Sequence, residues 1–406
     1  MKILMVLDGD FNTDERVRNE ADILFDAGHD VSVMHYEYSS SSTVNGKHKR
    51  IKTIPLGKNK KWRNKWYFFS SITSNFFRFW ASKIQDEVDI NNYDVVHFHD
   101  LYMWKAALKL NNRNKFKTVL DLHENYPYAI YGYKWATKFP NFLIVQPWRW
   151  KSFAKKHLSE ANRIIVLSKA YKSRLLQKYP SLQEQQMFVY PNIPNVNKLL
   201  NFPVKKDIIP KTQNDFYIFY FGGISKRRGI FTSINAMNYV GQLKYNVKLL
   251  LIGPVDKSEK QEFNRAISAP SVKSKIVYIP WINFQELPSY LNVVDICISP
   301  IIKNPQHESG VANKVFQYML FEKPIIVSNC RPQTEIVEHE KCGLVFKSED
   351  ERDLADKIDL LIDNDGLRRQ MGENGKKAIK EKYNTQVFGK QLVKLYTSLE
   401  NEKNNK

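Results

Sequence analysis

The sequence alternates short apolar runs with amphipathic stretches along its whole length, in two successive series. This alternation is typical of βα units, whose strands form a parallel sheet with helices on both faces. The first series ends in a Pro191-Asn192-Ile193-Pro194 segment, where the prolines interrupt a strand, so the second series starts a second sheet. The apolar runs lie at 2–7, 31–36, 95–98, 118–122, 163–167 and 188–190, and then at 217–221, 247–252, 276–279, 296–299, 324–328 and 343–346.

The chain length of 406 residues fits two domains of ordinary size. We expect an N-terminal doubly wound domain over 1–191 and a C-terminal one over 192–384. An amphipathic helix is expected over 385–406, packing back on the N-terminal domain. Two such domains facing each other bind ligands at the carboxyl ends of their strands, so the loops after the strands should hold the site.

Composition narrows the class of protein. Hydrophobic residues make up 43% of the chain and charged residues 26%, which excludes a disordered polymer. The three cysteines form no CxxC pair, which argues against a disulfide framework or a cysteine zinc site and fits a reducing compartment. The N-terminal apolar run is short for a signal peptide and no run of 18 apolar residues occurs, so we expect a cytoplasmic protein.

The net charge of +20 predicts attraction to an anionic partner. Residues 47–83 hold eleven Lys or Arg and no Asp or Glu, interleaved with aromatic residues. Three interpretations of this segment are open: packing within the first domain, attachment to an anionic membrane surface, and binding of a polyanion such as nucleic acid. If the segment is helical, its spacing predicts one apolar stripe formed by Trp62, Trp66, Phe69, Phe76 and Trp80.

Polar residues follow several strands of the first series. Asp14 is either the N-cap of a helix over 14–27 or a contact for an acceptor hydroxyl. His97 lies inside an apolar strand, which favours a structural role, whereas His123 follows a strand, where an imidazole can bind a sugar hydroxyl or transfer a proton. The first loop lacks GxGxxG and the histidines lack the spacing of a helical ligand pair, so we expect neither a dinucleotide cofactor nor a metal.

Two loops of the second series suit anion binding. One is a glycine-rich turn followed by three consecutive cations, which can cradle a diphosphate; the alternative is a solvated basic turn. The other is a Ser-Gly turn leading into a helix, whose backbone amides are expected to face an anion; the alternative is a capped surface helix. The residues concerned are Gly222, Gly223, Lys226, Arg227 and Arg228 in the first loop, and Ser309, Gly310, Lys314 and Gln317 in the second.

In these motifs the chain resembles the retaining glycosyltransferases of the GT-B fold, most closely glycosyltransferase family 4. The GT-B fold consists of two Rossmann-like domains facing across a cleft. The matching stretches occur in order along nearly the whole chain: Asp14-x-Arg16, Val95 to Asp100, Asp121 to Glu124, Val166 to Ser168, Tyr190 to Asn192, Gly222 to Gly229, Leu251 to Pro254, Asp295 to Pro300 and Lys314 to Met319.

The resemblance implies transfer of a sugar from a nucleotide-diphosphate sugar to an acceptor hydroxyl, with retention of configuration and without a metal or other cofactor. Cations and helix N-termini would stabilise the leaving diphosphate. The implied catalytic residues are His123, Arg228 and Glu308; the donor-binding residues are Gly222, Gly223, Lys226, Arg227, Arg228, Ser309, Gly310, Lys314 and Gln317; the acceptor-binding residues are Asp14, Arg16, His99 and Glu124.

The sequence departs from the family pattern in two places. Gly223 replaces the arginine that commonly follows the first glycine of the second-domain turn, and we expect Lys226 or Arg227 to compensate. The family's Glu-x7-Glu pair is not intact, because Gln317 occupies the second position, Ser309 the first, and Glu308 lies one residue earlier. Gln317 keeps a donor and an acceptor for ribose hydroxyls.

Two other functions are open on the sequence: a nucleotide-sugar epimerase on the same fold, and a polyanion- or nucleic-acid-binding protein that uses 47–83. The two-domain pattern without a nucleic-acid recognition motif favours the glycosyltransferase. By analogy with the family, we expect a lipid-linked or saccharide acceptor in cell-envelope polysaccharide or glycolipid synthesis, at the cytoplasmic face of a membrane. An inverting reaction would need a carboxylate base in the first domain, such as Asp14 or Glu124.

Overall fold

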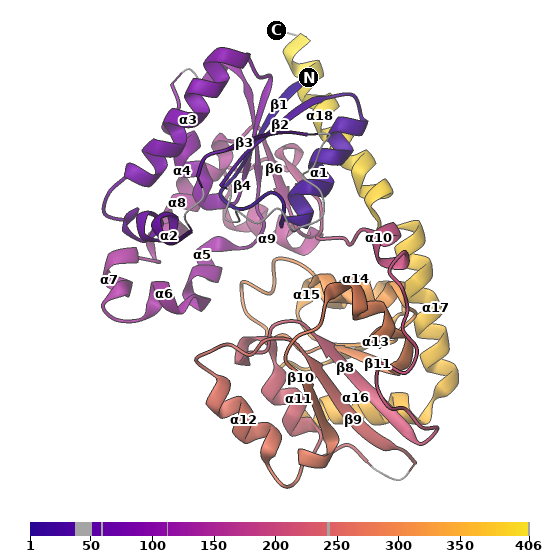
Figure 1. The fold of residues 1–406 in the computed structure, drawn as a ribbon. Helices are drawn as coiled ribbons and strands as arrows, with labels where there is room; N and C mark the ends of the chain where they lie inside the picture. The colour runs from indigo at the N-terminus through magenta and orange to yellow at the C-terminus, as the bar shows by residue number, and fades with distance from the viewer. Residues whose placement is uncertain (37–50, 58–59, 112, 242–243, 405–406) are drawn as a thin grey trace. The chain divides into compact units, whose positions relative to one another are not determined.

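The computed structural model describes residues 1–36, 51–57, 60–111, 113–241 and 244–404. The chain separates into two compact units, one formed by Met1–Pro191 with Phe388–Lys406 and the other by Asn192–Val387. Each unit has a parallel sheet covered by helices (Figure 1). The α/β class with two parallel sheets is confirmed.

The sheet of the first unit has, in the described residues, seven strands in the order β3-β2-β1-β4-β5-β6-β7. The order reverses between β1 and β4, and in doubly wound sheets ligands bind at the carboxyl ends of the strands at such a point. The sequence pattern does not predict β3, a short strand whose residues are mostly exposed. The bounds are β1 Lys2–Leu7, β2 Asp30–His35, β3 Lys52–Pro55, β4 Val95–His99, β5 Lys117–Asp121, β6 Arg163–Val166 and β7 Met187–Val189.

The α-helices of the first unit cover both faces of this sheet. Strand residues alternate between two cores: Leu4 and Val6 belong to one, and Ile3 and Met5 to the other. The bounds are α1 Glu15–Asp26, α2 Lys60–Phe69, α3 Asn75–Asn91, α4 Trp104–Ala107, α5 Tyr126–Ala129, α6 Lys134–Thr137, α7 Asn141–Val145, α8 Arg149–His157, α9 Lys169–Lys178 and α18 Thr385–Asn404.

Helix α18 contributes a row of buried side chains to the core that contains Ile3 and Met5. These residues are Leu392, Leu395, Tyr396 and Leu399. The Tyr396 hydroxyl forms a 2.8 Å hydrogen bond with Nδ1 of His97, a fully buried residue of β4. A residue near the end of the chain is therefore bonded to the strand that leads into the first-unit site.

The basic aromatic segment 47–83 forms β3, α2 and α3, while its residues 47–50 and 58–59 lie outside the described part of the chain. The expectation of one apolar stripe is wrong. The serine-rich turn 70–74 ends α2, and of the five predicted stripe residues only Phe76 and Trp80, both on α3, are in the core, at 2% and 0% exposure. Trp62 and Trp66 on α2 are 60% and 45% exposed.

The sheet of the second unit has, among the residues described, six strands in the order β10-β9-β8-β11-β12-β13, reversing between β8 and β11. No helix in the described residues of either unit is both long and apolar enough to span a bilayer. The strands are β8 Asp215–Phe221, β9 Asn246–Ile252, β10 Ile276–Ile279, β11 Ile296–Ser299, β12 Ile325–Ser328 and β13 Gly343–Phe346; the helices are α10 Val196–Leu200, α11 Ile230–Ala236, α12 Lys260–Ser268, α13 Leu287–Val293, α14 Asn313–Leu320, α15 Arg331–His339, α16 Glu351–Asp363 and α17 Asp365–Glu381.

We predict that Leu395→Ala destabilises the first unit by about 2–5 kcal/mol, because it leaves a cavity under α18 in a fully packed core. Lys394→Ala, at an exposed position of the same helix, is the matched control and should change the free energy of unfolding little. Urea unfolding followed by hydrogen exchange assigned to each unit measures both. Equal stability of the two variants would show that α18 does not hold the first unit together.

Candidate active site

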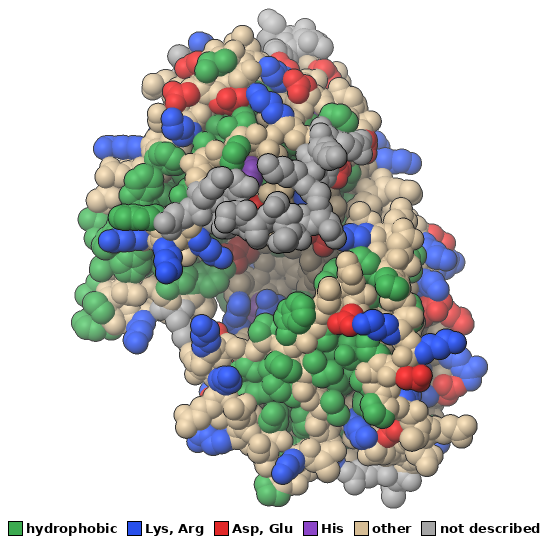
Figure 2. All heavy atoms as spheres, in the orientation of Figure 1, with side chains coloured by type: hydrophobic (Ala, Val, Ile, Leu, Met, Phe, Trp, Pro, Cys, Tyr) green, Lys and Arg blue, Asp and Glu red, His purple; other side chains and the backbone are tan. Residues whose placement is uncertain are grey.

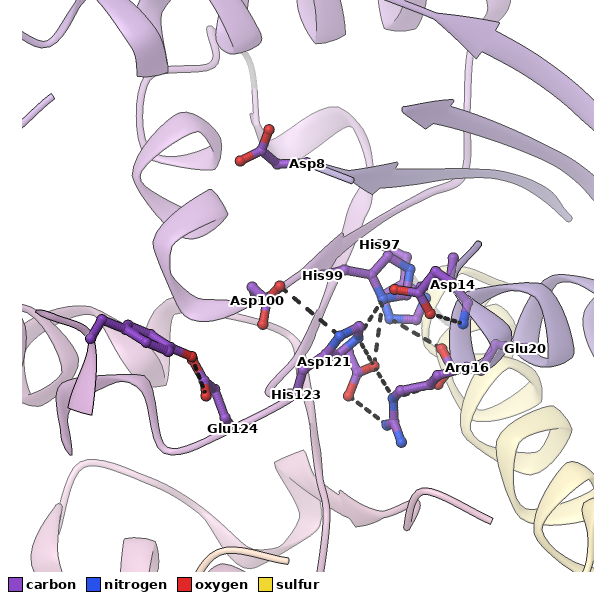
Figure 3. Close-up of polar contacts among 12 residues, drawn as sticks. Asp8, Asp14, Arg16, Glu20, His97, His99, Asp100, Asp121, His123 and Glu124 are labelled. Atoms are coloured by element: carbon purple, nitrogen blue, oxygen red, sulfur yellow. Dashed lines mark hydrogen bonds and ion pairs between the residues drawn. The ribbon is translucent and has the colours of Figure 1, made fainter. Parts of the chain in front are cut away.

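The first unit holds a buried polar cluster at the carboxyl ends of β4 and β5 (Figure 3). At its centre the Arg16 guanidinium of α1 donates from Nε and Nη2 to the two carboxylate oxygens of Asp121, both at 2.8 Å. Its Nη1 donates to the carbonyl oxygen of Tyr190 at 3.0 Å. Burial raises the pKa of Asp121, but Arg16 and His123 outweigh it and hold that pKa well below its usual range.

His123 is bonded to the same carboxylate, with Nε2 at 2.8 Å from Asp121 Oδ2. Burial lowers the pKa of His123, but the opposing effect of the negative charges of Asp121 and Asp100 is larger and brings the pKa to about 10. At neutral pH the ring is therefore an imidazolium, a hydrogen-bond donor and positive charge rather than a general base. Of the two roles that the sequence leaves open for His123, this charge favours binding an oxygen of the substrate over accepting a proton.

The cluster continues inward to Glu20 and His97. The carboxylate of Glu20 lies 3.1 Å from Arg16 Nε and 4.0 Å from His97 Nε2. Burial and the charge of Asp121 raise the Glu20 pKa to about 8, so this carboxyl is mostly protonated at neutral pH. Burial also lowers the pKa values of His97 and His99, which keeps both rings neutral. His97 therefore has the structural role that its place in an apolar strand favours.

Glu20, His97, His99 and Asp121 carry possible metal-ligand atoms within 4.8 Å of one another. The two histidines are two apart in β4, a spacing that places both side chains on one face of a strand and that a search for helical ligand pairs misses. However, Arg16 already contacts both oxygens of Asp121 and one of Glu20. The guanidinium thus supplies the positive charge that a metal ion would bring.

The predicted acceptor-binding residues have different surroundings. Arg16 and His99 are buried within the cluster, so direct contact with an acceptor is at odds with their positions. Asp14 caps α1, accepting a 3.0 Å hydrogen bond from the Val17 amide. Glu124 lies apart from the cluster (Figure 3), where its carboxylate accepts hydrogen bonds from the Tyr133 hydroxyl at 2.8 and 2.9 Å.

In the second unit, the turn after β8 packs against the end of β11. Gly229 has φ +72°, and a Cβ added there would lie 1.7 Å from the Pro300 carbonyl oxygen, so only glycine fits. Gly222 has φ +130°, and a Cβ there would lie 3.1 Å from Lys314 Nζ. The ammonium of Lys314 therefore lies close to the backbone of this turn.

Positive charge gathers around this turn. Lys314 lies buried on α14, with Nζ 3.4 Å from the centre of the Tyr220 ring and without a hydrogen-bond partner among the described residues. Its pKa lies well below the ordinary lysine value because of burial and repulsion from Arg228. Burial lowers the pKa of His307 to about 4, and repulsion from Arg228, Arg227 and Lys314 adds to this effect. His307 lies in the loop that leads into α14 and is not among the site residues predicted from the sequence.

Three other predicted residues of the second unit, two for donor binding and one for catalysis, have polar groups that already form hydrogen bonds or ion pairs. Lys226 forms a 2.8 Å ion pair with Glu262 of α12, on the outside of the turn. The Ser309 amide donates to the Gln306 carbonyl at 3.1 Å, so the expectation that this amide faces an anion is wrong. The reason is that Ser309 lies within a local turn that uses its amide. Glu308 accepts a 2.8 Å hydrogen bond from the Arg331 amide at the start of α15.

Comparison with known proteins identifies two sequence families, one in each half of the chain. The family described as Glycosyltransferase Family 4 matches residues 15–197, and the family described as Glycosyl transferases group 1 matches residues 201–378. The capsular polysaccharide biosynthesis glycosyltransferase CapM of Staphylococcus aureus is 27% identical over 48% of this chain and 50% of its own length. The match thus spans about half of that relative. The uncharacterized glycosyltransferase MJ1607 of Methanocaldococcus jannaschii is 22% identical over 81% of this chain and 83% of its own length.

Solved structures share the fold over nearly the full chain. Sucrose-phosphate synthase from Thermosynechococcus elongatus has a TM-score of 0.75 and 18% identity, covering 98% of this chain and 99% of that protein. Anabaena HepE, solved in complex with UDP and glucose, has a TM-score of 0.71 and 16% identity, covering 98% of this chain and 100% of that protein. With the family matches, these neighbours make this chain a glycosyltransferase of the GT-B fold. Its first half matches the Glycosyltransferase Family 4 model and its second half matches the Glycosyl transferases group 1 model.

We predict that Asp121→Asn lowers the pKa of His123 by roughly 1–3, because it removes the carboxylate that holds the proton on the ring. The pH at which the ring changes from imidazolium to neutral should then fall by the same amount, which an NMR titration of labelled histidine side chains detects. Asp86→Asn is the control, because Asp86 is exposed on α3 and pairs with Lys83 rather than with His123. An unchanged His123 titration midpoint in Asp121→Asn would contradict the assigned pairing.

Proposed function

We propose that this glycosyltransferase transfers a sugar from a nucleotide-diphosphate sugar to an acceptor hydroxyl, with retention of configuration and without a metal. The second unit binds the donor through Gly222, Arg228, Lys314 and Gln317, and Glu308 contacts the transferred sugar. In the first unit, His123 donates a hydrogen bond toward the transferred sugar. The observation that carries the proposal is the buried ammonium of Lys314, which lies beside the Arg228 turn.

A buried ammonium without an anionic partner is costly, and its pKa falls as a result. A diphosphate bound at the turn would supply the missing negative charge and bring the Lys314 pKa back up. Arg228 and Lys314 would then also stabilise the charge that develops on the leaving diphosphate. The UDP found with Anabaena HepE supports a nucleotide donor.

We predict that Arg228→Ala and Lys314→Met each weaken donor binding or catalysis by about 1.5–3 kcal/mol, the value of a hydrogen bond to a charged group. The measurement is the shift in melting temperature with UDP or GDP, followed by kinetics with a nucleotide sugar. Lys273→Ala, an exposed cation of the same unit, is the control. Unchanged nucleotide binding and kinetics in both variants would rule out this turn as the diphosphate site.

We also propose that the acceptor is a cell-envelope saccharide or lipid-linked saccharide, and that the first unit attaches to the cytoplasmic face of an anionic membrane. The likeness to the capsular polysaccharide enzyme CapM supports such an acceptor. For the membrane, residues 125–159 resemble 47–83 in lacking Asp and Glu. These two segments also carry many of the exposed large apolar side chains: Trp62, Trp66, Phe69, Ile72, Tyr131, Trp135, Phe139, Leu143 and Trp148.

The two segments lie side by side on the first unit. The Ser71 hydroxyl donates to the Val145 carbonyl at 2.9 Å, and the rings of Tyr67 and Trp135 are 5.7 Å apart. Figure 2 shows Lys and Arg side chains among hydrophobic ones on this part of the unit, where Figure 1 places α2, α6 and α7. Exposed aromatic residues mixed with cations are typical of a membrane interface.

We predict that Lys60→Gln/Lys61→Gln/Lys65→Gln weakens co-sedimentation with phosphatidylglycerol-containing vesicles at 0.1 M salt, by about 1 kcal/mol per charge. All three lysines are exposed on α2. Arg63 is left unchanged because it pairs with the Asp8 carboxylate and its loss would disturb the fold. Lys376→Gln/Lys377→Gln/Lys380→Gln on α17 of the second unit is the control. Equal vesicle binding by the two triple variants would remove the membrane role of α2.

A further inference from the structure

A pocket of about 550 Å³ lies on the first unit and shares no lining residue with the His123 cluster. It forms where the turn between α2 and α3 meets α4 and α8. Its volume is in the range that binds small molecules or their headgroups. The residues that line it are Ser70, Ser71, Ser74, Phe77, Lys105, Leu108, Lys109, Trp148, Arg149, Ser152, Phe153 and Lys156.

The charged residues of this pocket are all cations: Lys105, Lys109, Arg149 and Lys156. In the described part of the chain none of them forms an ion pair with a carboxylate. Arg149 donates instead to the neutral side-chain oxygen of Gln146 at 2.8 Å. Most other lysines and arginines with interactions on this unit, such as Arg113 beside Glu160, do have an acidic partner. The pocket therefore concentrates positive charge that the protein itself leaves unbalanced.

Lys105 is the most buried of these cations, and aromatic rings surround its ammonium. Nζ lies 4.0 Å from the centre of the Trp150 ring and 5.4 Å from those of Phe77 and Phe153. Such rings hold a cation in place by their negative faces, but they do not neutralise its charge. Burial, together with repulsion from Arg149 and Lys109, lowers the Lys105 pKa to about 8. A bound anion would relieve this repulsion.

Hydroxyl groups and a helix N-terminus complete the lining. Ser70 and Ser74 come from the turn before α3 and Ser152 from α8, whereas the hydroxyl of Ser71 in the same turn already donates to the Val145 carbonyl. Ser74 precedes α3 as its N-cap residue, yet its side chain makes no capping hydrogen bond. The first turn of this 17-residue helix thus has its positive end at the pocket wall. Ammonium, guanidinium and hydroxyl donors of this kind suit the oxygens of a phosphate group.

We propose that this pocket binds the phosphate group of an anionic phospholipid, a role that rests on the membrane-facing surface proposed above. A lipid is favoured over a free phosphate because apolar residues adjoin the charged ones. Ile72, in the same turn as the lining serines, is 63% exposed, and Trp148 in the lining is 43% exposed. With the phosphate held by Lys105 and Arg149, these two side chains are placed to contact the acyl region.

The test uses dihexanoyl-phosphatidylglycerol below its micelle concentration, with binding measured by calorimetry on the full chain. Lys105→Met/Lys109→Gln/Arg149→Gln should weaken binding at least tenfold. Lys60→Gln/Lys61→Gln/Lys65→Gln loses the same charge outside the pocket and should bind as the wild type does. If the first variant fails to fold, Lys109→Gln/Lys156→Gln replaces it, since both of these lysines are exposed. If the pocket variant and the α2 variant weakened lipid binding equally, net charge alone would explain the effect and the proposed site would be overturned.

Two further outcomes are informative. One distinguishes a lipid phosphate from a free phosphate, and the other distinguishes the pocket proposal from the membrane-surface proposal. Binding of inorganic phosphate or glycerol phosphate as tight as that of the short-chain lipid would overturn the lipid assignment. Vesicle binding that depends on α2 but not on the pocket residues would overturn the pocket and leave the proposed membrane surface intact. The expected result is that vesicles containing phosphatidylglycerol bind the pocket variant at least tenfold more weakly, whereas UDP binding in the second unit is unchanged.

Discussion

The bidentate ion pair between Arg16 and Asp121 is the interaction on which the first-unit site depends. It ties α1 to the end of β5 and, through the Tyr190 carbonyl, to the end of the first sheet. The same carboxylate fixes the charge of His123. Removing one partner would leave an uncompensated buried charge, which costs about 3–5 kcal/mol. The fold and the protonation state of the site residue thus rest on one contact.

The two units differ in whether the positive charges of their candidate sites are balanced by nearby carboxylates. In the first-unit cluster the cations Arg16 and His123 face the carboxylates of Asp121 and Asp100, so little net charge is left. In the second unit, Arg228 and Lys314 lie at a glycine turn beside a His307 ring that burial keeps neutral, and the ammonium of Lys314 has no hydrogen-bond partner in the part of the chain that the structure describes. A balanced cluster suits a neutral saccharide and an unbalanced one suits a diphosphate, in agreement with the roles proposed for the two units.

The alternating apolar runs predicted both sheets and nearly all of their strands, because buried parallel strands consist of continuous apolar residues. β3 was missed since it is an exposed edge strand with lysine and proline. Predictions from the spacing of residues along the chain were also wrong or missing where contacts between distant residues determine the structure. Trp62 and Trp80 fit one helical stripe by their spacing, but a serine-rich turn separates the two helices that carry them. The sequence also gives no sign of two long-range contacts, the ion pair of Arg63 with Asp8 and the hydrogen bond of Tyr396 with His97. The position of His123 after β5 was predictable, whereas its charge depends on Asp121 and Arg16, which come together only in the fold.

The protonation states bear on the stereochemical course. An inverting transfer needs a general base close to the acceptor hydroxyl. His123 holds its proton at neutral pH, the Asp14 carboxylate accepts the Val17 amide hydrogen bond that begins α1, and Glu124 accepts hydrogen bonds from Tyr133. Each of these groups already has a partner that fixes its position. A retaining transfer, in which the departing phosphate of the donor assists the acceptor hydroxyl, needs no such base, and the cations around Lys314 are the groups that would hold that phosphate in place.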